Sequence, residues 1–256
     1  MNTKRKNLAV IPALATMLML TLTISTMQAN AADASQSKQK SRPNILLIVA
    51  DDLGYSDLGS YGGEIKTPVL DDLAQQGMRY TNFYVSPTCS ITRSMLLSGT
   101  DNHVAVLGNM GEFNAPNQVG KPGYEGVLNK RVASIAELLK DNGYHTYMAG
   151  KWHLGMKPDQ IPHARGFGLD VSTMGGGGSD FDDGWNIELQ NPKMPYTEDG
   201  RPVKKLPKDF YSTKAYTDKT LEFIEEGRKD NKPFFAYLTY TAPHGPLHLP
   251  DDWLRR

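Results

Sequence analysis

Short apolar runs recur along this chain and are separated by segments whose apolar residues follow helical spacing. Three runs have the length of a buried strand, at residues 44–50, 144–149 and 234–240, and the segment 79–85 has the composition of another. The run at 44–50 is apolar almost throughout, which predicts a central strand buried on both faces. Strands that alternate with helices predict an α/β protein with a central, mostly parallel sheet and helices on both faces.

Signals for helix starts and ends fall between these runs. Thr67 and Pro68 supply a cap and a first-turn proline, and Gly77 supplies a stop, so a helix is expected between them. Glycine, proline, aspartate and lysine dominate the segment 174–208, which predicts a long excursion that borders the site. The helices expected from spacing and end signals lie at 68–76, 90–97, 132–139 and 212–228.

The N-terminal segment has the pattern of a secretory signal peptide. Basic residues at 4–6 precede an apolar run at 8–24, and the small residues at 29 and 31 form a cleavage site. An uncleaved membrane anchor is the alternative, because the apolar run is long for a signal. The chain is therefore expected to be periplasmic or secreted. Its expected parts are a signal peptide at 1–31, a polar lead-in at 32–42 and a folded domain at 43–256.

The charge balance limits which kinds of partner the chain can bind, and the cysteine count limits the state of its thiol. The chain has 28 basic and 28 acidic residues, and cleavage after residue 31 would leave 25 basic residues against 28 acidic ones. No basic block favours nucleic acid, and after cleavage no apolar stretch is long enough for a stable membrane span. Cys89 is the single cysteine, so it is a free thiol, an intermolecular link or a residue that is chemically converted.

Polar residues follow the ends of the expected strands. Asp51 and Asp52 come after the first strand, Lys151 and His153 after the second, and His244 after the last. In open α/β sheets, ligands bind beyond the carboxyl ends of the strands, so these side chains are expected to converge. The paired carboxylates suit calcium or magnesium, although an isolated Asp-Asp pair is commonly only a loop or helix cap.

The helix expected at 90–97 begins beside the lone cysteine. Unpaired N–H groups and the helix dipole favour an anion at this end, and Arg93 adds a fork of donors one turn from Cys89. The pair therefore predicts a sulfate or phosphate site; the alternative is a small buried thiol and a surface arginine. We interpret the other histidines as structural, with His103 close to Cys89 in sequence: His103, His145, His163 and His248.

Motifs in a fixed order resemble one known family. NILLIVADDLG, CSITRSMLLSG, GKWH and APHGP occur in this order between residue 44 and residue 246, and SGTDNH follows the cysteine motif. Together they resemble the type I, formylglycine-dependent sulfatases, most like the bacterial arylsulfatases, from about Arg42 to the last residue. The resemblance implies an alkaline-phosphatase-like α/β sandwich. On this basis residues 43–256 would be the N-terminal part of the catalytic domain, with the C-terminal part missing.

The resemblance also implies a nucleophile and a cation. Cys89 would be oxidised to formylglycine by a formylglycine-generating or sulfatase-maturating enzyme, and one hydroxyl of the hydrated aldehyde would attack sulfur. Asp51 and Asp52, together with position 89, would bind Ca²⁺ or Mg²⁺. The family's further cation ligands and a second sulfate-binding lysine would lie beyond Arg256.

The remaining roles implied by the resemblance fall on four side chains. Arg93 would fix the formylglycine hydrate, while Lys151 and His244 would bind the sulfate group. His244 would also protonate the leaving oxygen, and His153 would be the base that expels sulfate. The implied substrates are aryl sulfates, other small sulfate esters or sulfated glycans.

Two alternatives to a sulfatase stay open at the level of sequence. A phosphonate or phosphate ester hydrolase of the same superfamily would hold a similar tetrahedral anion. A non-catalytic anion-binding protein is the other, because Ile91 stands where the family's modification signature has proline or alanine. In that case Cys89 would stay a thiol.

Overall fold

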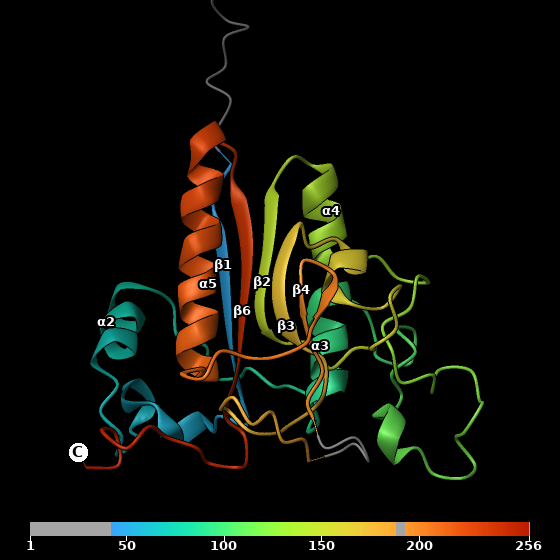
Figure 1. Ribbon diagram of the computed structural model, residues 1–256, viewed down its shortest axis with the longest axis horizontal. Coiled ribbons are helices and arrows are strands. Elements are labelled where there is room, and N and C mark those ends of the chain that lie inside the picture. Colours follow the sequence, from blue (N-terminus) through green and yellow to red (C-terminus); the bar gives the residue numbers. More distant parts are fainter. Residues whose placement is uncertain (1–41, 188–192, 256) are drawn as a thin grey trace, which may run out of the picture. The chain divides into compact units, whose positions relative to one another are not determined.

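The computed structural model describes residues 42–187 and 193–255 (Figure 1). The expected signal peptide at 1–31, and all but the last residue of the lead-in, lie outside these residues. Within the described ranges, no helix combines the length and the apolar character needed to cross a membrane.

A sheet of six strands forms the centre of the fold, in the order β1-β6-β2-β3-β4-β5. Neighbours among β1, β6, β2 and β3 are parallel, whereas β4 and β5 are added antiparallel. This confirms the expected α/β class with a mostly parallel sheet. The strands are β1 (Ile45–Asp51), β2 (His145–Lys151), β3 (Leu169–Thr173), β4 (Tyr196–Glu198), β5 (Arg201–Val203) and β6 (Phe234–Pro243).

Alternate side chains of the sheet pack against helices on its two faces. Phe235 and Tyr237 of β6 belong to a core cluster that includes Leu97 of α3 (Cys89–Ser98) and Ala136 of α4 (Ile135–Asp141). The intervening residues of β6 point to the opposite face, where α5 (Ser212–Gly227) packs on β6 and β2 (Figure 1). The period-two alternation of a strand thus places helices on both faces, as expected.

The helix ends follow local sequence signals. Helix α2 (Pro68–Gln76) starts after Thr67 and stops at Gly77, where the sequence placed it. Helix α3 is one residue longer at each end than expected, because Cys89 is already its first residue. Helix α4 begins later than its apolar pattern, because Ser134 caps it and accepts a hydrogen bond of 3.1 Å from the Glu137 N–H.

Three expectations about strands are corrected by the structure. The segment 79–85 is not a strand: it is exposed and pairs with no sheet, so its β-forming composition finds no partner. Strand β1 is an edge strand of the described sheet, with Ile48 49% exposed, not a central strand buried on both faces. The excursion at 174–208 contains the short hairpin of β4 and β5, whose three-residue strands are too brief to show a period.

A buried carboxylate at β3 predicts a pH dependence of stability. Asp170 is 0% exposed, and burial raises its pKa from 3.8 to about 6, partly offset by His163. Because the folded state binds the proton more tightly than the unfolded state, this contribution is complete below pH 3.8 and is lost as pH rises through 6. The free energy of unfolding should therefore fall by about 3 kcal/mol over this range from this group.

The substitution Asp170→Asn should remove that dependence. Urea unfolding of wild type and variant between pH 4.5 and 8 measures the pH dependence of the free energy of unfolding. At the alkaline end of this range, the variant should be more stable than the wild type. Asp141→Asn, at the exposed end of α4, is the matched control and should leave the wild-type pH profile unchanged. Parallel pH profiles for wild type and Asp170→Asn would contradict the prediction.

Candidate active site

The carboxyl ends of three parallel strands and the N-terminus of α3 supply the site residues, at the lower end of the sheet in Figure 1. Asp51 is the last residue of β1, and Lys151 is the last residue of β2. Strand β6 ends directly before His244, and α3 starts at Cys89. The ends of parallel strands share one edge of the sheet, so residues far apart in sequence gather there.

An irregular end of β1 separates the two adjacent aspartates. The register with β6 shifts between Val49 and Asp51, and Asp52 has a left-handed φ of 64°. The backbone therefore turns at Asp52 itself. As a result Asp51 is buried, whereas the Asp52 side chain is 64% exposed.

Asp51 lies between two buried cations. The Nζ of Lys151 donates to its Oδ2, and the Nη2 of Arg93 lies 3.3 Å from its Oδ1. Each of the three side chains is at most 5% exposed. Two cations with one carboxylate leave a net positive charge that water screens poorly, so an anion is attracted strongly to this point. Arg93 is therefore no surface residue.

Arg93 is fixed by the strand ends and keeps one donor for a ligand. Its Nη1 donates to the Lys151 carbonyl oxygen at 2.7 Å and also to the hydroxyl of Thr239. Its Nη2 faces Asp51 Oδ1 at 3.3 Å but makes no well-aligned hydrogen bond within the described residues. This nitrogen carries two N–H groups, so one of them is available to a ligand oxygen beside Asp51.

Cys89, His153 and Glu112 form a hydrogen-bonded chain. Cys89 Sγ lies 3.1 Å from Nδ1 of His153, and Nε2 of the same ring lies 2.6 Å from Oε1 of Glu112. Burial opposes ionisation of the thiol, but the His153 hydrogen bond and the Lys151 charge lower the pKa of Cys89. Burial also disfavours the charged imidazole, yet its contacts with Cys89 and Glu112 raise the pKa of His153 to about 9. The ring can thus exchange a proton with the group at position 89.

His244 lies apart from this chain of contacts. Its Nε2 is 3.7 Å from Oδ2 of Asp52, and its side chain is 22% exposed. The glycine-rich excursion passes close by, because a Cβ added at Gly177 would lie 2.7 Å from the His244 ring. The excursion therefore borders His244, and only glycine permits this approach.

The donor chemistry fits part of a site for a hard cation. Asp51 and Asp52 offer carboxylate oxygens that leave the chain in different directions, and position 89 follows at the helix terminus. Lys151 and Arg93 occupy the Asp51 carboxylate, which shows that cationic charge is accommodated there. Among the described residues, no group of three or more histidine, cysteine, aspartate and glutamate side chains is placed to hold a metal ion.

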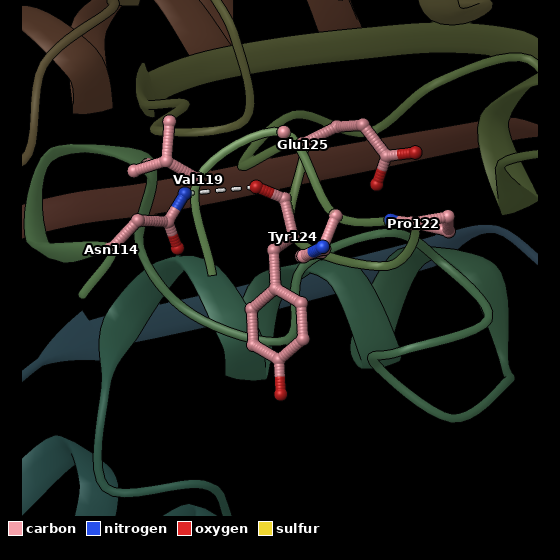
Figure 2. Close-up of a pocket in the computed structure, with 8 residues that line it drawn as sticks. Asn114, Val119, Pro122, Tyr124 and Glu125 are labelled. Atoms are coloured by element: carbon pink, nitrogen blue, oxygen red, sulfur yellow. Dashed lines mark hydrogen bonds between the residues drawn. The ribbon is translucent and has the colours of Figure 1, made fainter. Parts of the chain in front are cut away.

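The loop that carries Glu112 also lines a groove of about 400 Å³ on the protein surface (Figure 2). Asn114 donates to the Tyr124 carbonyl oxygen at 2.8 Å, as the dashed line in Figure 2 shows. Gly126 has a φ of 70°, and a Cβ there would lie 2.5 Å from Gly111 Cα. The two sides of the loop are therefore held closely together beside Cys89 and His153.

The four remaining histidines have partners elsewhere in the fold. His145 pairs with Asp230 at 2.8 Å, and His163 lies 3.6 Å from Asp170. The His103 ring packs edge-on against Tyr124, and the His248 ring packs against Phe181. No contact of His103 with Cys89 is seen in the described residues. Glu112, in contrast, lies within the site although sequence reasoning did not select it.

Comparison with known proteins agrees with the site. The sulfatase family model matches residues 43–256. The arylsulfatase of Klebsiella aerogenes is 45% identical over 226 residues, which cover 88% of this chain and 48% of that protein. An uncharacterised sulfatase of Schizosaccharomyces pombe is 45% identical over 230 residues, covering 87% of this chain and 41% of that protein.

Solved structures show the same relationship. The crystal structure of Ps i-CgsB in complex with k-i-k-neocarrahexaose is 33% identical, with a TM-score of 0.69, and the match covers 83% of this chain and 48% of that chain. The mostly parallel sheet with helices on both faces defines an α/β protein, and its site places a thiol beside a buried cationic cluster. The chain belongs to the sulfatase family and has its alkaline-phosphatase-like fold. It spans about half of the length of the relatives it matches.

Proposed function

We propose that the protein of which this chain is part hydrolyses sulfate esters, and that Cys89 is converted to formylglycine for this purpose. The observation that carries the proposal is the buried, net positive cluster of Arg93, Lys151 and Asp51 at the carboxyl edge of the sheet. A sulfate group bears the opposite charge and three terminal oxygens, which suit the Nη2 of Arg93 and the Lys151 ammonium. Membership of the sulfatase family supports the same chemistry.

Each side chain has a role that its position supports. Converted Cys89 would supply a hydrated aldehyde whose hydroxyl is the nucleophile towards sulfur. Arg93 would fix the formylglycine hydrate and offer Nη2 to a sulfate oxygen, and Lys151 would bind the sulfate group and stabilise the charge that develops on it. His153 would accept a proton at Nδ1, the nitrogen that faces position 89. His244, at the rim of the site, would bind sulfate and protonate the leaving oxygen.

A divalent cation belongs to this proposal. Asp51 and Asp52, with the oxygen at position 89, would hold Ca²⁺ or Mg²⁺, and the cation would lower the pKa of the nucleophilic hydroxyl when bound. Lys151, whose ammonium contacts Asp51, would in addition bind a sulfate oxygen.

The substrate class and the cellular setting are also proposals. An aryl sulfate is the first substrate to test, because the arylsulfatase of Klebsiella aerogenes is among the relatives. Sulfated glycans are the second class, since an N-acetylgalactosamine-6-sulfatase of Canis lupus familiaris is 31% identical over 258 residues. The pattern at 1–31 supports export to the periplasm or the outside, and conversion of Cys89 requires a formylglycine-generating or sulfatase-maturating enzyme.

The test uses the full-length protein produced together with a formylglycine-generating enzyme. We expect release of sulfate from an aryl sulfate, faster than release of phosphate from the matching aryl phosphate. Mass spectrometry of the tryptic peptide Tyr80–Arg93 should show an aldehyde oxygen in place of the Cys89 sulfur. Faster phosphate release would favour a phosphate ester hydrolase, and an unmodified thiol without sulfate release would identify an anion-binding protein.

A further inference from the structure

The geometry points to Glu112 as a positioning residue, which holds the imidazole of His153 with Nδ1 towards position 89. The inference rests on the proposed function, in which His153 takes a proton from the oxygen at that position. Glu112 Oε1 is 2.6 Å from Nε2 of His153, while Nδ1 is 3.1 Å from Cys89 Sγ. A 180° flip of the ring would put Cδ2 in the place of Nδ1 and Cε1 in the place of Nε2, and it would break a hydrogen bond to a carboxylate, which is among the stronger kinds.

His153 needs such a partner because its backbone is unusual. Its φ of 54° is left-handed, a conformation that a residue with a side chain adopts only where its surroundings hold it. The residues before and after it, Trp152 and Leu154, are fully buried and anchor the main chain. They do not set the rotation of the ring, whereas a hydrogen bond to Nε2 does.

Glu112 is itself held in place by its loop. It is the middle residue of the short turn Gly111–Phe113, and Asn109 donates to the Phe113 carbonyl oxygen at 2.7 Å. On the other side, Met110 Sδ lies 3.9 Å from Cys89 Sγ. The loop therefore touches both members of the Cys89 and His153 pair. The Glu112 side chain is 30% exposed, so it can be substituted without opening the core.

Kinetics of the converted full-length protein provide the first test. In Glu112→Ala, kcat for an aryl sulfate should fall about 10- to 100-fold, the effect usual for partners that orient a functional histidine. KM should change by less than about threefold, because Lys151 and Arg93 still bind the sulfate group. Glu112→Gln keeps an acceptor oxygen and should recover part of kcat. Glu125→Ala, which removes an exposed carboxylate from the same loop, should leave kcat unchanged.

A second readout does not depend on activity. In the unconverted full-length protein labelled with ¹⁵N-histidine, the Nε2–H proton of His153 should give a low-field NMR signal that exchanges slowly with water. Its absence from His153→Gln assigns it. The signal should disappear in Glu112→Ala, persist in Glu125→Ala, and move upfield in Glu112→Gln because a neutral amide is a weaker acceptor.

The two readouts separate this inference from the proposed function. If the converted protein releases no sulfate while the NMR signal behaves as expected, the proposed function fails and the positioning role of Glu112 stands. An unchanged signal in Glu112→Ala, or a kcat within twofold of wild type, would overturn the positioning role. If Glu112→Ala does not fold, an unmoved signal in Glu112→Gln overturns it instead.

Discussion

Cys89→Ala should abolish release of sulfate from an aryl sulfate, with a loss of at least about 10⁴-fold in kcat, because no other group at the site can replace the nucleophile. Arg93 and Lys151 stay in place in this variant, so binding of inorganic sulfate should persist. The measurement is sulfate release under saturating substrate, with sulfate binding followed by calorimetry. Fold should be intact, since the thiol is only partly buried at the start of α3.

The neighbouring residue offers a matched control for this variant. Ser90 is 2% exposed and its hydroxyl has no hydrogen-bond partner within the described residues. Ser90→Ala therefore removes one oxygen from the same turn of α3 without breaking a contact, and sulfate release should stay within about twofold of wild type. Residual activity of Cys89→Ala above about one hundredth of wild type would contradict the assignment of the nucleophile.

Asp51→Asn should lower the free energy of unfolding by about 3–5 kcal/mol, because it leaves two buried cations without their counter-charge. Lys151 and Arg93 both contact the Asp51 carboxylate, and a neutral amide cannot compensate them. Urea unfolding in the presence of a chelator measures this cost without a contribution from bound divalent cations. Sulfate release should also fall, because Asp51 is one of the three proposed cation ligands.

Substitution of the adjacent aspartate, Asp52, separates the effect of a buried charge on stability from the effect of a lost carboxylate on activity. Asp52 carries the same functional group, but its side chain is 64% exposed and lies 3.7 Å from His244. Asp52→Asn should therefore change the free energy of unfolding by no more than about 0.5 kcal/mol while still impairing sulfate release. Equal losses of stability in the two variants would contradict the account of the buried cluster.

Local sequence signals predicted structure correctly where the residues that stabilise an element lie within the element or next to it. Helix α2 starts and ends at the cap, proline and glycine that the sequence offers, because these residues act on the backbone beside them. The prediction of a strand at 79–85 was wrong, because a strand is stabilised by a neighbouring strand and the composition of a segment does not say whether such a neighbour is available. The short strands β4 and β5 were not predicted, because three residues are too few to show the alternation of apolar and polar side chains that marks a strand.

The sequence by itself determined the α/β class, the family and the positions of the residues that we assign to the site, since these depend on local periodicity and short motifs. Tertiary structure alone decided that Asp51 is shared by Lys151, 100 residues away, and by Arg93. It also decided that Glu112, 41 residues from His153, faces its ring. Such contacts depend on the order of strands in the sheet and on how a loop closes over the end of α3, and no local pattern encodes either. Burial of these charges, which strengthens their attraction for an anion, is likewise a property of the assembled fold.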